Sequence, residues 1–178
     1  MKKEKMLNKP NLIFFMIIVL AAVARIIPHP PNFTPIGGLA LFSGAHFKNN
    51  KAYLIPLGAM LLSDLFLGFH STMIYVYFSF FMIILLGKLL RDRLNIIRLG
   101  VISLTASVIF FMITNFGVWF TFDFYSKDVR GLTNCFLMAV PFFRNTILGD
   151  LFYSFSFFYG YQFLDLIIKK LSFSFKKN

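Results

Sequence analysis

The chain has 178 residues, of which 58% are hydrophobic and only 14% are charged, whereas soluble domains are about 45–50% apolar and about 25% charged. Its net charge of +11 does not indicate nucleic-acid binding, because the basic residues stand at the ends of apolar segments and not along one polar face. The single cysteine, Cys135, excludes an intramolecular disulfide and a metal site built from several cysteines. The composition therefore predicts an all-α membrane protein that contacts lipid and no nucleic acid.

Six apolar segments, the second of them short, follow one another along the chain, and we expect them to form one transmembrane domain over residues 1–178. A helix needs about 20 residues to cross a bilayer, so little of the chain remains for a soluble domain. The second segment begins at Thr34-Pro35, where threonine suits the N-cap and proline the first helical position. The predicted spans are residues 11–27, 35–47, 53–69, 72–90, 98–122 and 146–168.

A shorter apolar segment, residues 131–140, precedes the last span. It is too short to cross a bilayer, and Pro141 and Arg144 separate it from the span that follows. A seventh crossing would also place one terminus on the opposite side of the membrane. We therefore predict a short re-entrant or surface helix on the outer side, sheltered by protein or water.

The basic residues predict the orientation of the bundle. Fourteen of the eighteen Lys and Arg residues fall in the N-terminus, residues 48–51, residues 88–98 and the C-terminus, which form one alternate set of connections. The positive-inside rule places this set in the cytoplasm, so both termini are predicted to be cytoplasmic in a multi-pass protein. An alternative interpretation of the first span is a cleaved signal peptide, with Ala22-Val23-Ala24 as the small-residue site.

Polar residues inside or beside the spans collect toward the predicted outer side, where charged groups usually mark function. Such groups, drawn from several helices, predict an outward-facing pocket that holds a small ligand by hydrogen bonds, ion pairs and stacking. The candidate ligand-binding residues are Arg25, His29, Asn32, Asp64, His70, Asn115, Trp119, Arg144, Asn145 and Asp150. The alternative is that Arg25–Asp64 and Arg144–Asp150 pairs only fasten helix ends. Asp165 is the inner exception and is expected to pair with Lys169.

Small residues mark the second span as a packing helix. Small side chains let helices approach closely in lipid, and internal packing is favoured here over docking on a partner protein. The residues concerned are Gly37, Gly38, Ala40, Gly44 and Ala45.

Several catalytic motifs are absent from the sequence. It contains no G-x-x-x-x-G-K-[ST], no H-E-x-x-H and no G-x-S-x-G, so we expect neither an enzyme nor a cofactor or resident metal. One alternative is a membrane-embedded metal-binding protein or enzyme that uses His29, His70, Asp64 and Asp150, because histidine and carboxylates suit several divalent metals. Another is a structural or assembly protein of the membrane.

Four stretches carry a family resemblance: residues 25–38 (RIIPHPPNFTPIGG), 63–70 (SDLFLGFH), 114–119 (TNFGVW) and 141–150 (PFFRNTILGD). They resemble an uncharacterised family of small bacterial integral membrane proteins, which is in turn similar to the substrate-binding (S) components of energy-coupling factor vitamin transporters. The resemblance implies a six-helix bundle in the bacterial cytoplasmic (inner) membrane that captures a vitamin-like solute from outside. It also implies a coupling membrane subunit with ATPases as partners. S components often carry A-x-x-x-A on the first helix, whereas here Arg25 follows Ala21 at that spacing.

Overall fold

The computed structural model describes residues 9–175, which form helices and connections without a strand. The helices are α1 (Lys9–Ile26), α2 (Ile36–His46), α3 (Lys51–Leu67), α4 (Met73–Gly87) with a short 3-10 continuation η1 (Lys88–Leu90), α5 (Ile96–Thr121) and α6 (Val129–Phe175). The predicted all-helical class is confirmed. Helices α1, α2, α3 and α5, and α4 together with η1, begin and end within two residues of the predicted segments. Five lysines used to predict the orientation lie outside the described residues: Lys2, Lys3, Lys5, Lys176 and Lys177.

Three helical segments of the described chain are long and apolar enough to cross a membrane: Met73–Leu90, Ile96–Thr121 and Val129–Ile167. These segments make the chain a membrane protein. Helix α2 differs from the predicted second span, because 11 residues reach only about 16 Å at about 1.5 Å per residue. The hydrocarbon core of a bilayer is about 30 Å thick. Helix α2 therefore cannot cross alone and lies within the bundle instead.

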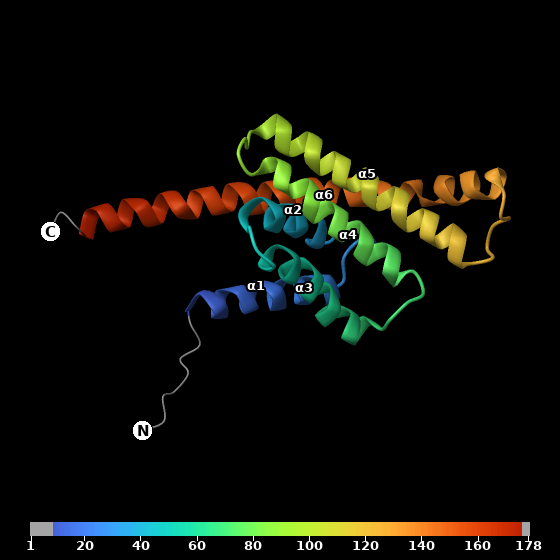
Figure 1. Ribbon diagram of the computed structural model, residues 1–178, viewed down its shortest axis with the longest axis horizontal. Helices are drawn as coiled ribbons and strands as arrows, with labels where there is room; N and C mark the ends of the chain where they lie inside the picture. Colours follow the sequence, from blue (N-terminus) through green and yellow to red (C-terminus); the bar gives the residue numbers. More distant parts are fainter. Residues whose placement is uncertain (1–8, 176–178) are drawn as a thin grey trace, which may run out of the picture.

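The connections alternate between the two ends of the bundle (Figure 1). The start of α1, the α2–α3 and α4–α5 connections and the end of α6 lie at one end, and the other three connections lie at the opposite end. We call the first of these the basic end. The described lysines and arginines that lie in or beside its connections are Lys48, Lys51, Lys88, Arg91, Arg93 and Arg98.

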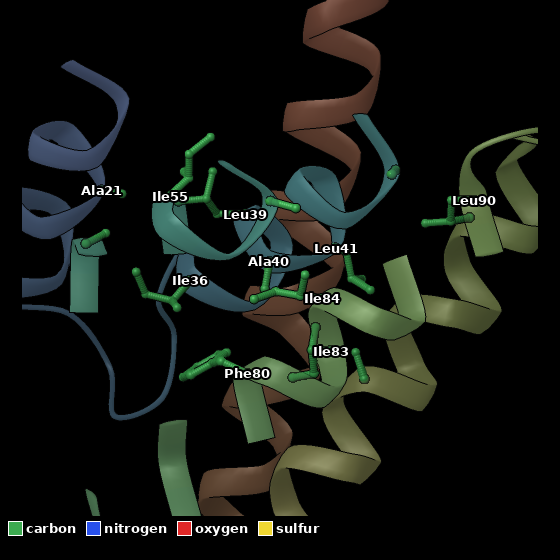
Figure 2. Close-up of a cluster of buried hydrophobic side chains, with 14 of the residues drawn as sticks. Ala21, Ile36, Leu39, Ala40, Leu41, Ile55, Phe80, Ile83, Ile84 and Leu90 are labelled. Carbon is green, nitrogen blue, oxygen red and sulfur yellow. The ribbon is translucent and has the colours of Figure 1, made fainter. Parts of the chain in front are cut away.

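Helix α2 is the centre of the core. Its residues from Ile36 to Ala45 are buried, apart from a half-exposed Phe42, and it packs against α3, α4 and α6. Figure 2 shows Leu41 of α2 beside Ile83 and Ile84 of α4. Because apolar side chains cover α2 on nearly every side, burial rather than a single amphipathic face holds this short helix in place.

The small residues of α2 permit these close contacts. A Cβ added to Gly44 would lie 2.0 Å from the Ile84 carbonyl oxygen of α4, and one added to Gly38 would lie 2.7 Å from the Ser154 nitrogen of α6. No side chain fits at such separations. All five small residues predicted as a packing set (Gly37, Gly38, Ala40, Gly44 and Ala45) are buried within the chain, so their surfaces face other helices of the same molecule.

Arg91 closes the C-terminal end of α2. Its Nε donates to the Ala45 carbonyl at 3.2 Å, and its Nη2 donates to the carbonyls of Gly44 at 3.0 Å and Phe47 at 2.9 Å. The last carbonyls of a helix have no partner inside it, and a cation is also favoured at that end of the helix dipole. Arg91 therefore ties the α4–α5 connection to the core helix.

The structure differs from the prediction before the last span. Residues 131–140 are helical, but they continue through Pro141 into one 47-residue helix, α6. The reason is a single buried face: Gly131, Cys135 and Ala139 lie four residues apart, and Thr146 continues the face two turns later. This face packs on α5, where the Cys135 thiol donates to the Asn115 carbonyl at 3.5 Å. Packing thus keeps the helix continuous across a proline, as membrane helices tolerate.

Candidate functional site

An ion pair joins α1 to α3 at the end opposite the basic end. Nη1 of Arg25 donates to Oδ1 of Asp64, to the Ser63 hydroxyl at 2.7 Å and to the Met60 carbonyl at 3.4 Å. The hydroxyl of Tyr77, on α4, donates to Oδ2 of Asp64 at 2.8 Å. The Asp64 side chain is only 1% exposed, so both of its oxygens are engaged inside protein. The predicted pairing of Arg25 with Asp64 is therefore present.

A cavity of about 240 Å³ lies beside this ion pair. Its polar lining comes from α1, from the α1–α2 and α3–α4 connections and from α6, while Gly37 of α2 and four apolar residues of α4 and α5 form the remaining wall. We call it the outer cavity. The polar lining residues are Arg25, Asn32, Thr34, His70, Thr146 and Asp150, and the apolar ones are Val76, Phe80, Ile83 and Phe110.

Asn32 is held in an unusual backbone conformation at the mouth of the outer cavity. Its φ is +64°, a left-handed value that asparagine tolerates better than most residues. It follows three prolines, which restrict the backbone of the connection. The connection also lies close to α6, because a Cβ added to Gly149 would lie 3.1 Å from the Phe33 Cα. The α1–α2 connection is thus a stiff segment seated on α6.

Asp150 is the acid among the residues that line this cavity, and it is buried, with 6% of the residue exposed. Its Oδ2 accepts a hydrogen bond from the Ser107 hydroxyl of α5 at 2.7 Å. The structure gives no contact with Arg144, the other member of the pairing considered from sequence, whose side chain is exposed. Asp150 therefore faces the cavity without a neighbouring cation from its own helix.

A second cavity of about 340 Å³ runs between α5 and α6 and shares four lining residues with the outer cavity. The shared residues are Asn32, Val76, Phe110 and Thr146. Asn115 lines this second cavity, while its side-chain amide donates to the Phe111 carbonyl at 2.7 Å. Ligand sites are commonly about 300–1,000 Å³, so the two adjoining cavities offer the volume of a small organic molecule.

The remaining candidate residues have other positions. His29 directs its two ring nitrogens to the Pro30 and Arg25 carbonyls, at 2.9 and 3.0 Å. Trp119 donates to the Ser126 carbonyl at 2.9 Å and so closes the α5–α6 connection. Asn145 is half-buried and Arg144 is exposed. None of these four is among the residues that line the outer cavity.

The comparison with protein families decides what the chain is related to. Residues 5–171 match the model of a family described as a family of unknown function (DUF6580). The chain belongs to this family. Comparison with curated proteins and with solved structures gives no match. The predicted membership of an uncharacterised family is therefore confirmed, while the family itself assigns no activity to the cavity.

The four residues considered as metal ligands are not gathered into one centre. In the described part of the chain, no three His, Cys, Asp or Glu side chains lie close enough together to hold a metal ion. The oxygens of Asp64 are bonded to Arg25 and Tyr77. The Nδ1 of His70 lies 3.1 Å from the Thr72 hydroxyl. The geometry thus gives the metal-binding alternative no support.

Sequence reasoning missed several hydroxyl groups that complete the site. Thr34 and Thr146 line the outer cavity, and Ser107 and Tyr77 bind the two buried carboxylates. A pattern for two of these was present in the sequence: Thr146, Asp150 and Ser154 are spaced four apart on α6, facing Ser103 and Ser107, also four apart, on α5. Such matched polar spacings place two stripes on facing sides of neighbouring helices.

Proposed function

We propose that the chain is a membrane protein that binds a small organic solute in the outer cavity. The observation that carries the proposal is the composition of the wall: polar groups from α1, α6 and two connections face an apolar surface of α4 and α5. Binding sites for small molecules combine apolar walls with fixed polar groups, and this cavity has both, with polar residues the more numerous. Asp64 and Ser63 lie behind Arg25 and hold its guanidinium, and Tyr77 in turn donates to Asp64.

The proposal places the outer cavity on the external side of a bacterial inner membrane. The described basic connections lie at the opposite end of the bundle, and basic connections are retained in the cytoplasm. Both termini are then cytoplasmic. Labelling of Ser71→Cys and Asp92→Cys in a Cys135→Ala background tests this, with a membrane-impermeant maleimide applied to intact cells or spheroplasts. We expect labelling only at position 71, and labelling only at position 92 would reverse the orientation.

The proposal further assigns the chain the part of a substrate-binding component rather than of an enzyme or a complete transporter. It rests on the similarity to S components of energy-coupling factor transporters and on the absence of a P-loop motif from the sequence. A separate membrane subunit with ATPases would supply the energy. Because the small residues of α2 are buried, this subunit would have to bind another surface, such as the exposed faces of α1 or α3.

Native mass spectrometry of protein purified in a mild detergent tests solute binding. We expect a population with one small organic molecule attached, which is released intact by collisional activation. The released molecule can then be identified and added back to stripped protein. A protein that emerges empty, and that takes up no small molecule when incubated with the low-molecular-weight fraction of a cell extract, would contradict the proposal.

A further inference from the structure

The outer cavity contains one carboxylate, Asp150, that forms no ion pair with any cation of the described residues. Asp150 is 6% exposed, and its only hydrogen-bond donor in the described structure is the Ser107 hydroxyl, on Oδ2. Its Oδ1 has no donor and belongs to a residue that lines the cavity. A buried charge is stable only when it is paired and hydrogen-bonded. Oδ1 of Asp150 is therefore a place where a group of the ligand can donate a hydrogen bond to the carboxylate.

Arg25 does not offer a ligand such an unbalanced charge. Its charge is already balanced by Asp64, and its Nη1 is directed at three acceptors of α3. The two charged residues of the cavity wall thus differ in kind: Arg25 faces the cavity with its charge compensated by Asp64, whereas Asp150 faces it with no cation beside it. When Asp64 is counted with Arg25, an ionised Asp150 leaves these three groups with one unbalanced negative charge.

The position of Gly37 keeps the Asp150 carboxylate where it is. A Cβ at position 37 would lie 1.9 Å from Oδ1 of Asp150, so only glycine leaves room for the carboxylate against α2. Gly37 lies in the first turn of α2, and the N-terminal end of a helix favours a negative charge. The close approach of Gly37 therefore fixes the Asp150 carboxyl group next to the cavity, with Gly37 as a positioning residue.

The opposite wall is suited to a ring. Phe80 and Phe110 both line the outer cavity, and their rings lie 5.2 Å apart between centroids at 43°. From this wall and the unbalanced carboxylate we propose that the solute is an organic cation, a ring that carries a protonated nitrogen group such as an amine or amidine, with this group bound to Oδ1 of Asp150. The inference rests on the proposed function and names the chemical class of its solute.

Three probes of equal shape test the charge: benzamidine, benzamide and benzoate, which are a cation, a neutral molecule and an anion. Dissociation constants are measured by ligand-observed NMR titration of the full-length protein in detergent. We expect benzamidine to bind the wild-type protein at least about tenfold more tightly than either other probe, because a charge-assisted hydrogen bond is about twice as strong as a neutral one. Tighter binding of benzoate would point to Arg25 and overturn the assignment.

Variants then locate the contact. Asp150→Asn preserves the size of the side chain and removes its charge, and Gly37→Ala displaces the carboxylate without touching its chemistry. Both are expected to weaken benzamidine binding about tenfold or more, whereas Asp165→Asn, at an exposed site of α6, leaves it unchanged. Unaltered benzamidine binding by Asp150→Asn overturns the assignment.

The outcome also separates this inference from the proposed function. If native mass spectrometry releases a neutral or anionic solute, the function stands and the cation assignment falls. If the released solute is a cation and its binding is weakened by Asp150→Asn, both stand. If no solute is retained and none of the three probes binds, both fall.

Discussion

Replacement of Asp64 with asparagine removes one charge from the buried pair that joins α1 to α3. The side chain is 1% exposed and accepts from both Arg25 and Tyr77. Loss of one partner from a buried ion pair costs about 3–5 kcal/mol. The guanidinium side chain is 16% exposed and so keeps part of its hydration, and asparagine retains one carbonyl acceptor. We therefore expect a loss of about 3 kcal/mol in the free energy of unfolding, at the low end of that range.

An exposed pair of the same chemistry provides the control. Asp165 and Lys169 pair at 2.6 Å, as predicted from their spacing, but their side chains are 42% and 72% exposed. Asp165→Asn should cost no more than about 0.5 kcal/mol. Reversible unfolding in mixed detergent micelles, followed by circular dichroism, measures both variants. Equal losses for Asp64→Asn and Asp165→Asn would refute the argument that burial strengthens the first pair.

A double-mutant cycle isolates the pair itself. Arg25→Gln, Asp64→Asn and the double variant are unfolded under the same conditions. Because the two side chains contact each other directly, the double variant should lose about 1–3 kcal/mol less than the sum of the single losses. Additive losses would show that the two residues act independently.

Three further predictions concern the core helix and the turn before α6. Arg91→Met leaves three carbonyls at the end of α2 without their donor and should lower the free energy of unfolding by about 2–3 kcal/mol. The control Arg93→Met, at an exposed position, should change it little. Equal losses in the two variants would contradict the capping role of Arg91. Gly44→Ala should destabilise the protein by about 2 kcal/mol or more, because the new Cβ meets a carbonyl of α4. The control Gly160→Ala, with open space around it, should stabilise the protein by about 0.5–1 kcal/mol. A stabilising Gly44→Ala would show that α2 and α4 are not in close contact. The pKa of Asp128 is lowered by hydrogen bonds from the backbone N–H of Gly131, in the first turn of α6, and from the Ser126 hydroxyl. The contribution of Asp128 to stability is therefore complete above the ordinary aspartate pKa of about 4, and it is lost as the pH falls through the lowered pKa. Hydrogen exchange at neutral pH should show faster exchange of that N–H in Asp128→Ala than in the wild-type protein, and unchanged exchange would remove this cap.

The sequence was sufficient to predict the first five helical segments and insufficient to predict the extent of α6. Apolar segments between charged residues set the boundaries of α1 to α5, because apolar residues favour lipid and the charged residues that flank them favour water. The continuity of α6 was not predicted, since Pro141 normally ends or bends a helix. It follows instead from the face shared by Cys135, Ala139 and Thr146, which depends on packing against α5.

The candidate site was predictable in part for a similar reason. Charged residues at the predicted outer ends identified Arg25, Asp64 and Asp150, because burial of charge is costly and seldom without a role. Which of them pair depends on the rotation of each helix about its axis, and a single sequence does not contain this information directly. In the structure Arg25 forms an ion pair with Asp64, whereas Arg144 is exposed and forms no ion pair with Asp150.

Occupancy of the outer cavity in two matched variants tests the central claim most directly. Val76→Trp fills the cavity from α4, and Ile74→Trp makes the same kind of change two residues away at a position that is 72% exposed. Native mass spectrometry of both proteins, purified alongside the wild type, gives the fraction that carries the solute. The proposed function predicts that Ile74→Trp retains the wild-type fraction and that Val76→Trp is empty. Equal occupancy in the two variants would contradict a binding site in the outer cavity.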